Sequence, residues 1–132
     1  MIRVPPGCSI EIHRTRQLED NLRELESRFP GFADDFTIAE QILKIDPFRG
    51  PVISASSSAQ TSTNRSLRKM HARSHAAKRG ANKGFRLVYN VQRNKNTFHV
   101  YLVHLYFKGD KEDLTSAEYA RLEKILVEIE RT

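Results

Sequence analysis

An α+β fold with a single sheet is predicted by three features of the sequence. Segments with the alternation or the β-branched and aromatic content of strands lie at 8–14, 67–73, 84–92 and 97–108. Apolar residues recur at helical spacing in two segments between residues 15 and 45, and again after a capping box at 115–118. We therefore expect one domain, 1–132, with an antiparallel-dominated, twisted sheet of about four strands, two N-terminal helices packed on it and a C-terminal helix.

The N-terminal part is expected to form a strand followed by two helices. Residues 8–14 alternate, which turns His13 outward, and we expect it to be a solvated strand residue rather than a ligand. Thr15 can cap a helix that ends at Pro30-Gly31, and a second helix is expected over roughly 32–45. The acidic residues of both helices are expected on solvated faces.

The middle of the chain combines a polar stretch with a basic strand. Residues 54–64 consist of Ser, Thr, Ala, Gln and Asn, and we expect a flexible Ser/Thr-rich insertion. The strand that follows places Lys69, His71 and Arg73 on one solvent-facing side, about 7 Å from neighbour to neighbour. This spacing is close to that of successive phosphates along a nucleic acid strand.

The segments 84–92 and 97–108 are expected to lie next in the sheet. One face of 84–92 suits the core, and the other presents Arg86 at a polar surface, where a rigid strand would hold it ready to grip a phosphate. The segment 97–108 is apolar on both faces and is expected to be central. Its His99 and His104 are expected to be packed or hydrogen-bonded strand residues.

Charge is distributed unevenly along the chain. The net charge is +6, but no Asp or Glu occurs from Pro47 to Gly109, a stretch that holds twelve of the 22 Lys and Arg residues. The remainder carries 10 basic and 16 acidic residues. Such a block favours a polyanionic partner, most simply nucleic acid. A membrane surface is less favoured, because the block has the periodicity of strands and not that of an amphipathic helix. The residues expected to bind RNA around the strand face are Arg65, Arg68, Lys78, Arg79, Lys83 and Lys108.

Composition favours a cytoplasmic protein without a cofactor. Cys8 is the single cysteine, which cannot form an internal disulfide and fits a reducing compartment. The N-terminus lacks the apolar run of a signal peptide, and the longest apolar stretch, near 98–107, is far short of the roughly 20 residues that span a bilayer. No metal-ligand spacing, Ser-His-Asp arrangement or dinucleotide fingerprint is found, so we expect no metal.

The order of these segments and three of their motifs resemble the RelE/ParE superfamily of toxins from type II toxin–antitoxin systems, in its RelE/HigB-like branch. The motifs are Arg-Leu-Val-Tyr at 86–89 after a glycine, the basic strand at 69–73, and the stretch 106–115. The resemblance covers nearly the whole chain from Cys8 onward. It implies a toxin that cleaves messenger RNA, commonly in the ribosomal A site, and is neutralised by a tightly bound antitoxin.

The resemblance also implies the site residues. RelE-type enzymes carry lysines on the second strand and an arginine on the third, and Lys69 and His71 fall at the lysine positions while Arg86 falls at the arginine. Arg73 continues the same face, which completes the expected catalytic set. These enzymes also place a tyrosine or histidine near the C-terminus, but residues 113–115 are Asp-Leu-Thr. The identity of the general base and acid is therefore left open.

The chemistry itself also favours this group of residues. Metal-independent cleavage of RNA uses the 2′-hydroxyl as an internal nucleophile and needs a base, cations around the phosphorane and an acid for the leaving 5′-oxygen. Arg86 and Lys69 could hold the phosphate. His71 has an unperturbed pKa near neutrality, and neighbouring cations disfavour its protonated form, which suits a base.

Two other functions stay open on the same sequence. A ParE-like toxin would bind and inhibit DNA gyrase without catalysis, and a basic nucleic-acid-binding domain could have the same fold without toxicity. For a toxin, the expected partners are a cognate antitoxin, an acidic chain that folds on binding, together with messenger RNA and the ribosome. Neither a membrane nor a small-molecule cofactor is expected as a partner.

Overall fold

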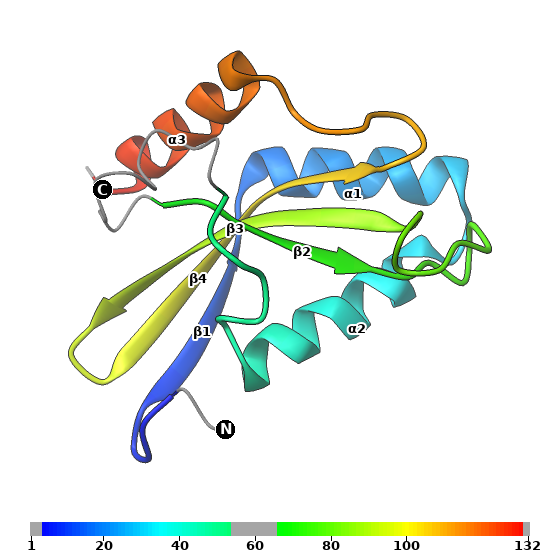
Figure 1. Cartoon of the computed structure of the whole chain (residues 1–132). Coiled ribbons are helices and arrows are strands. Elements are labelled where there is room, and N and C mark those ends of the chain that lie inside the picture. Colours follow the sequence, from blue (N-terminus) through cyan, green and yellow to red (C-terminus); the bar gives the residue numbers. More distant parts are fainter. Residues whose placement is uncertain (1–3, 54–65, 131–132) are drawn as a thin grey trace.

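The structure, a computed structural model, describes residues 4–53 and 66–130, which form an α+β fold. In chain order the elements are β1 (Ser9–Arg14), α1 (Arg16–Arg28), α2 (Phe32–Ile45), β2 (Arg68–Ala72), β3 (Phe85–Asn94), β4 (Thr97–Phe107) and α3 (Ser116–Glu130) (Figure 1). The expected insertion at 54–64 and the expected RNA-binding residue Arg65 lie outside the described residues. Within the described ranges, no helix combines the length and the apolar character that crossing a membrane requires.

The four strands form one mixed sheet in the order β1-β4-β3-β2. β4 is antiparallel to β3, and β3 is antiparallel to β2, while β1 pairs with β4 in parallel. The sheet is therefore antiparallel in two of its three pairings, and β4 has a neighbour on each side. This confirms that the apolar segment 97–108 forms a central strand.

Local capping sets the bounds of the helices close to those expected. The Thr15 hydroxyl oxygen accepts a hydrogen bond from the Leu18 N–H at 3.2 Å, which begins α1. Gly31, with a φ of 98°, turns the chain between α1 and α2. Before α3, the Thr115 N–H donates to Glu118 at 2.9 Å and the Glu118 N–H donates to the Thr115 hydroxyl at 3.2 Å. This reciprocal pair is the expected capping box.

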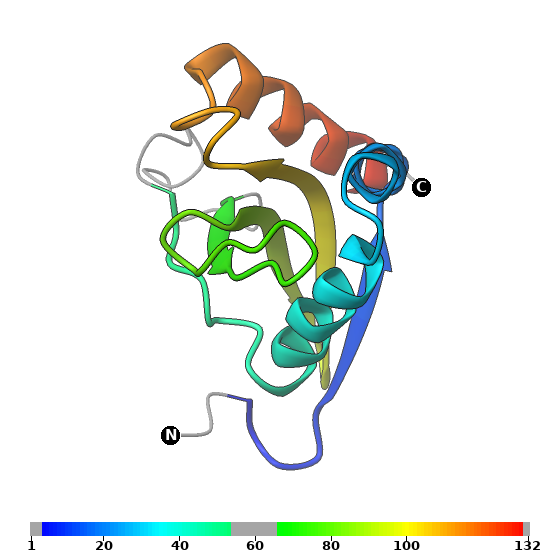
Figure 2. The ribbon, with the colours of Figure 1, turned by 90° about the vertical axis from the view of Figure 1, so that its right-hand side faces the viewer.

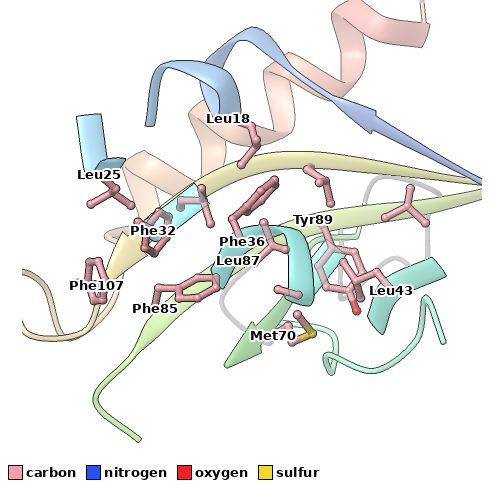
Figure 3. Packing of buried hydrophobic residues seen from close by; sticks show 14 residues of the cluster. Leu18, Leu25, Phe32, Phe36, Leu43, Met70, Phe85, Leu87, Tyr89 and Phe107 are labelled. Carbon is pink, nitrogen blue, oxygen red and sulfur yellow. The ribbon is translucent and has the colours of Figure 1, made fainter. Parts of the chain in front are cut away.

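One face of the sheet packs against α1 and α2 and forms the larger core (Figure 3). Phe32 lies edge-on to Phe85, with 4.9 Å between ring centroids, and Leu87 and Tyr89 are fully buried on the same side. Burial of each such side chain contributes about 1.5–3 kcal/mol to folding. The inward face expected for 84–92 is therefore confirmed. The Tyr89 hydroxyl also accepts a hydrogen bond from the Gly50 N–H at 2.8 Å and so fixes the chain after α2.

The opposite face of the sheet carries a second core, because α3 packs there (Figure 2). Val88 of β3 and Val103 of β4 are fully buried against apolar residues of α3 and its flanking segments. The expectation that this face of 84–92 is a polar surface is therefore wrong. By the alternation of the strand, Val88 and Asn90 share this face with Arg86, and the three residues are 0%, 1% and 4% exposed.

Two acidic residues of α2 also depart from the expected solvated face. Asp35 is buried and accepts hydrogen bonds from the Ser74 hydroxyl at 2.8 Å and from the Ala76 N–H at 3.0 Å. Glu40 is buried beneath Arg14 of β1, whose Nε and Nη2 donate to its two oxygens at 2.8 and 2.9 Å. Both carboxylates can be buried because distant segments supply their donors.

Candidate active site

A row of three polar residues crosses the sheet on the α3 side. His71 of β2 is the register partner of Arg86 of β3, which is in turn the register partner of Tyr106 of β4. Directly opposite residues in antiparallel strands point to the same face, so these three side chains share one surface. Lys69 lies two residues before His71 on β2, opposite Val88, and therefore points to the same face. We call Lys69, His71, Arg86 and Tyr106 the cationic row.

Arg86 is buried within this row instead of being presented from it. Its Nη1 donates to the Ala81 carbonyl and its Nη2 to the Asn82 carbonyl, each at 2.9 Å. The loop that it holds also depends on Gly84, where an added Cβ would lie 1.9 Å from the Ala72 carbonyl oxygen. Arg86 therefore closes the loop between β2 and β3 and supplies a fixed positive charge from beneath the surface.

His71 lies exposed above this charge and is held in its neutral form. Partial burial lowers the pKa of His71, and the positive charges of Arg86, Lys69 and Lys108 lower it further. An imidazole with a pKa below its usual value is neutral at pH 7 and offers a free lone pair. This protonation state is the one that a general base requires.

Lys69 is oriented by an acidic residue from the segment before α3. Its Nζ lies 3.2 Å from Oδ1 of Asp113, an oxygen that also accepts hydrogen bonds from the Tyr119 hydroxyl and, at 2.7 Å, from the Leu114 N–H. Burial acts to raise the pKa of Asp113, but the hydrogen bonds from Tyr119, Leu114 and Lys69 together hold it below its ordinary value. Asp113 is thus an anion that fixes the position of the Lys69 ammonium.

Two tyrosines complete this part of the molecule. The Tyr106 hydroxyl is buried and has no hydrogen-bond partner among the described residues. Burial, together with the Asp113 carboxylate, raises the pKa of Tyr106 to about 12, against the opposing effect of Arg86. Burial and the hydrogen bond to Asp113 also raise the pKa of Tyr119. Both phenols are therefore protonated at neutral pH, and the Tyr119 hydroxyl donates to Asp113.

Sequence reasoning did not assign a role to either tyrosine or to Asp113. The alternation along β4 places Tyr106 on the same face as His104, and this signal could have identified Tyr106. Tyr119 belongs to α3, and its contact with Asp113 depends on how α3 docks. No sequence pattern links those two positions.

The remaining basic residues divide into two groups by position. Lys108 directly follows β4 and lowers the pKa of His71, so it lies within electrostatic reach of the row. Arg73 is exposed just after β2. Lys78 and Lys83 are exposed in the loop before β3. These four residues are free to meet a ligand that approaches the loop and the strand ends.

Arg68 and Arg79 are instead engaged in packing. Arg68 alternates with Lys69 and faces away from it, and its Nη1 donates to the Gly50 carbonyl at 2.8 Å. The Arg79 guanidinium lies 4.9 Å from the ring centroid of Phe107, next to the first core. The structure does not bring these two expected RNA-binding residues into the cationic row.

A cavity of about 300 Å³ adjoins the row at the outer edge of β2. His71 and Arg73 line it from the β2 side. Arg49 adds a guanidinium to the lining and His75 adds an imidazole. Residues 51–53 pair with the outer edge of β2 near residues 67–69, so the cavity adjoins only the part of this edge that follows Lys69. Asp35, Ile38 and Ile42 of α2 form the opposite wall, so the lining combines basic groups with a carboxylate and apolar side chains.

Comparison with known proteins yields neither a matching family model nor a curated protein of similar sequence. The chemical groups of the site are one neutral imidazole, the cations Lys69, Arg86 and Lys108, and two protonated phenols. Together they can accept a proton and stabilise negative charge on a phosphate.

Proposed function

We propose that this protein is the toxin of a type II toxin–antitoxin system and a metal-independent endoribonuclease that cleaves messenger RNA at the ribosome. The observation that carries the proposal is the neutral His71 imidazole, set in register with Arg86 and beside Lys69. A mixed four-stranded sheet with two helices on one face and a C-terminal helix on the other is compatible with the RelE/ParE-like fold that the sequence resembles. The basic, acid-free stretch from 47 to 109 supplies the site and its surroundings.

Each group has a defined role in this reaction. The His71 imidazole takes the proton of the 2′-hydroxyl, whose oxygen attacks the adjacent phosphorus. Lys69 and Lys108 stabilise the negative charge of the phosphorane, and the buried Arg86 adds a fixed positive potential. The bond to the 5′-oxygen then breaks, and Lys69 is the candidate that donates a proton to it. The products are a 2′,3′-cyclic phosphate and a 5′-hydroxyl.

The partners follow from the charge of the surface. Arg73, Lys78 and Lys83 extend the row toward the loop before β3, where they can contact neighbouring phosphates of the RNA. The cognate antitoxin would be an acidic chain that covers the same residues and folds on binding. Antitoxin and RNA would then compete for one surface, which is how neutralisation would work.

One observation favours a second function, inhibition of DNA gyrase by a non-catalytic ParE-like toxin. Both terminal nitrogens of Arg86 are already bonded to loop carbonyls, so this arginine does not reach a phosphate in the free protein. A toxin that acts by binding another protein does not need that contact.

Expression in a bacterial host separates these functions. Wild-type protein is expected to arrest growth and to produce new 5′ ends inside translated messages, while His71→Ala abolishes both. The matched control is Lys124→Ala, which removes an exposed cation on α3 away from the row. Arrest with intact messages would support the gyrase inhibitor, and absence of arrest would support a plain nucleic-acid-binding domain.

A further inference from the structure

A second polar cluster lies on the α3 side of the sheet near the hairpin that joins β3 and β4. The parallel pairing of β1 with β4 sets Glu11 beside His99 and His13 beside Tyr101. His99 and Tyr106 are seven residues apart on β4, which corresponds to about 20 Å along the strand. The cluster of Glu11, His13 and His99 is therefore separate from the cationic row.

The three side chains direct their ligand-type atoms at one point. The His13 Nε2 lies 2.9 Å from the His99 Nδ1, and Oε2 of Glu11 lies 3.7 Å from the first nitrogen and 3.4 Å from the second. A tetrahedral zinc ion with bonds of about 2.0–2.1 Å separates its ligand atoms by about 3.3 Å. The three observed distances scatter around that value, so an ion needs only small side-chain rotations to fit.

The surroundings hold these ligands in place and leave one side open. The His13 ring stacks on Tyr101, with 4.9 Å between centroids and 20° between planes, which restricts its rotation. The side chains of Glu11, His13 and His99 are 57%, 39% and 24% exposed. An ion at this point would be reachable from solvent and could take a water as its fourth ligand.

We propose that Glu11, His13 and His99 form a zinc-binding site that joins β1 to β4. Two imidazole nitrogens and one carboxylate oxygen form a ligand set that suits Zn²⁺, whereas Mg²⁺ and Ca²⁺ select oxygen ligands. The site contains no residue of the cationic row, so it does not depend on the proposed ribonuclease function. This proposal departs from the sequence-based expectation that His13 is a solvated strand residue and not a ligand.

Zinc binding requires a defined change in protonation. At 2.9 Å, the His13 Nε2 and the His99 Nδ1 share one hydrogen in the metal-free protein, so one of the two nitrogens is a donor. Zinc would bind through the lone pairs of both nitrogens. The nitrogen that carries the hydrogen must therefore lose it to the other nitrogen of its own ring.

The test is a Zn²⁺ titration of the full chain, free of any polyhistidine tag, against a competing chelator. We expect one zinc ion per chain and a loss of affinity of about 100-fold or more in His13→Asn, His99→Asn and Glu11→Gln, since loss of a ligand costs at least as much as loss of a residue that supports one. The matched control is His75→Asn, which alters an exposed histidine outside the cluster and should bind as the wild type does. Zinc should also raise the melting temperature of the wild type but not of the ligand variants.

Cobalt provides a second readout that reports on geometry. Co²⁺ bound at this site should show the intense visible absorption of four-coordinate cobalt, and the ligand variants should lose it. Zinc affinity that is unchanged in the His13→Asn/His99→Asn double variant would overturn the proposal, as would a wild type that binds no zinc. Should a histidine variant fail to fold, Glu11→Gln still decides the outcome, because Glu11 is exposed and its side chain supports no core packing.

Discussion

At the scale of single residues, Arg86 shows how one side chain serves both the fold and the site. Its planar guanidinium donates in parallel to two carbonyls of the loop before β3, a geometry that the ammonium of lysine cannot reproduce. The same charge lies directly beneath His71 and lowers its pKa. The arginine therefore acts on the imidazole electrostatically, through a position that the loop contacts fix.

Arg86→Lys tests the structural half of this description. The lysine keeps the charge but loses at least one of two charge-assisted hydrogen bonds, so we expect the free energy of unfolding to fall by about 1–3 kcal/mol. Urea denaturation measures the difference. Arg23→Lys is the control, since Arg23 is an exposed α1 residue with only a 3.6 Å contact to Asp20. Equal stabilities of the Arg86 and Arg23 variants would contradict the buried anchoring role.

At the scale of elements, the loop between β2 and β3 is held from both sides of the sheet. Arg86 binds its carbonyls near residues 81–82, and Asp35 of α2 binds the Ser74 hydroxyl and the Ala76 N–H at its beginning. The loop carries Lys78 and Lys83, which extend the cationic row. Its conformation thus depends on two buried charged groups from separate elements.

Asp35→Asn should loosen this loop specifically. The amide is a weaker acceptor than the carboxylate and brings an extra donor into a buried position. We therefore expect the free energy of unfolding to fall by about 1–3 kcal/mol. Hydrogen exchange at residues 74–84 should become faster, while β3 and β4 exchange at rates that follow global stability. The matched control is Asp34→Asn, because Asp34 is exposed on the same turn of α2. Protection of 74–84 that is unchanged in Asp35→Asn would rule out the anchoring contact.

Sequence patterns predicted the elements well where the signal was local. Thr15, the turn at Pro30-Gly31 and the pair Thr115–Glu118 act within a few residues, so the bounds of the helices followed from them. The burial of Asp35 could not be predicted, because its partners Ser74 and Ala76 lie in a segment that only the tertiary fold brings near. Arg86 donates to carbonyls only five and four residues before it, but no pattern in that loop predicts the conformation that turns them toward the guanidinium. The docking of α3 onto the sheet likewise turned an expected polar face into a second core.

The same distinction applies to the candidate site. Lys69, His71 and Arg86 share a face because alternation in adjacent strands requires it once their register is set. The contribution of Asp113 and Tyr119 depends on the path from β4 to α3, for which the sequence has no periodic signal. Glu11, His13 and His99 were missed as a group because parallel pairing joins strands that are far apart in the chain.

At the scale of the whole molecule, titration of two histidines should shape stability in acid. Burial lowers the pKa of His104, and burial together with neighbouring cations lowers that of His71. In the unfolded chain both regain their ordinary values near 6.5 and bind protons that the folded state does not. Their contribution to stability is therefore fully present above about pH 6.5 and is lost as the pH falls from there through the lower folded-state pKa values.

A second loss should follow at lower pH from carboxylates that are paired in the folded state. The hydrogen bond from Lys111 is the main cause that lowers the pKa of Glu118 to about 2, and the hydrogen bond from Arg28 lowers that of Asp110. Their contributions are present above the ordinary carboxyl pKa near 4 and are lost toward the folded-state values.

Urea unfolding between pH 8 and about pH 2 measures both steps. We expect a plateau down to about pH 7, then a decline whose slope between pH 7 and pH 5 is reduced in His104→Gln. His75→Gln is the control, because it changes a histidine that is exposed to solvent. Stability that increases from pH 7 to pH 5 would contradict the direction of these pKa shifts.

The most direct test of the proposed function is cleavage of a defined messenger RNA by the purified protein in a translation reaction, with analysis of the new ends. The structure leads us to expect cuts that leave a 2′,3′-cyclic phosphate and a 5′-hydroxyl, lost in His71→Ala and retained in the control Lys124→Ala. Cleavage that persists in His71→Ala, products with 5′-phosphate ends, or an intact message with the wild type would each contradict the ribonuclease assignment.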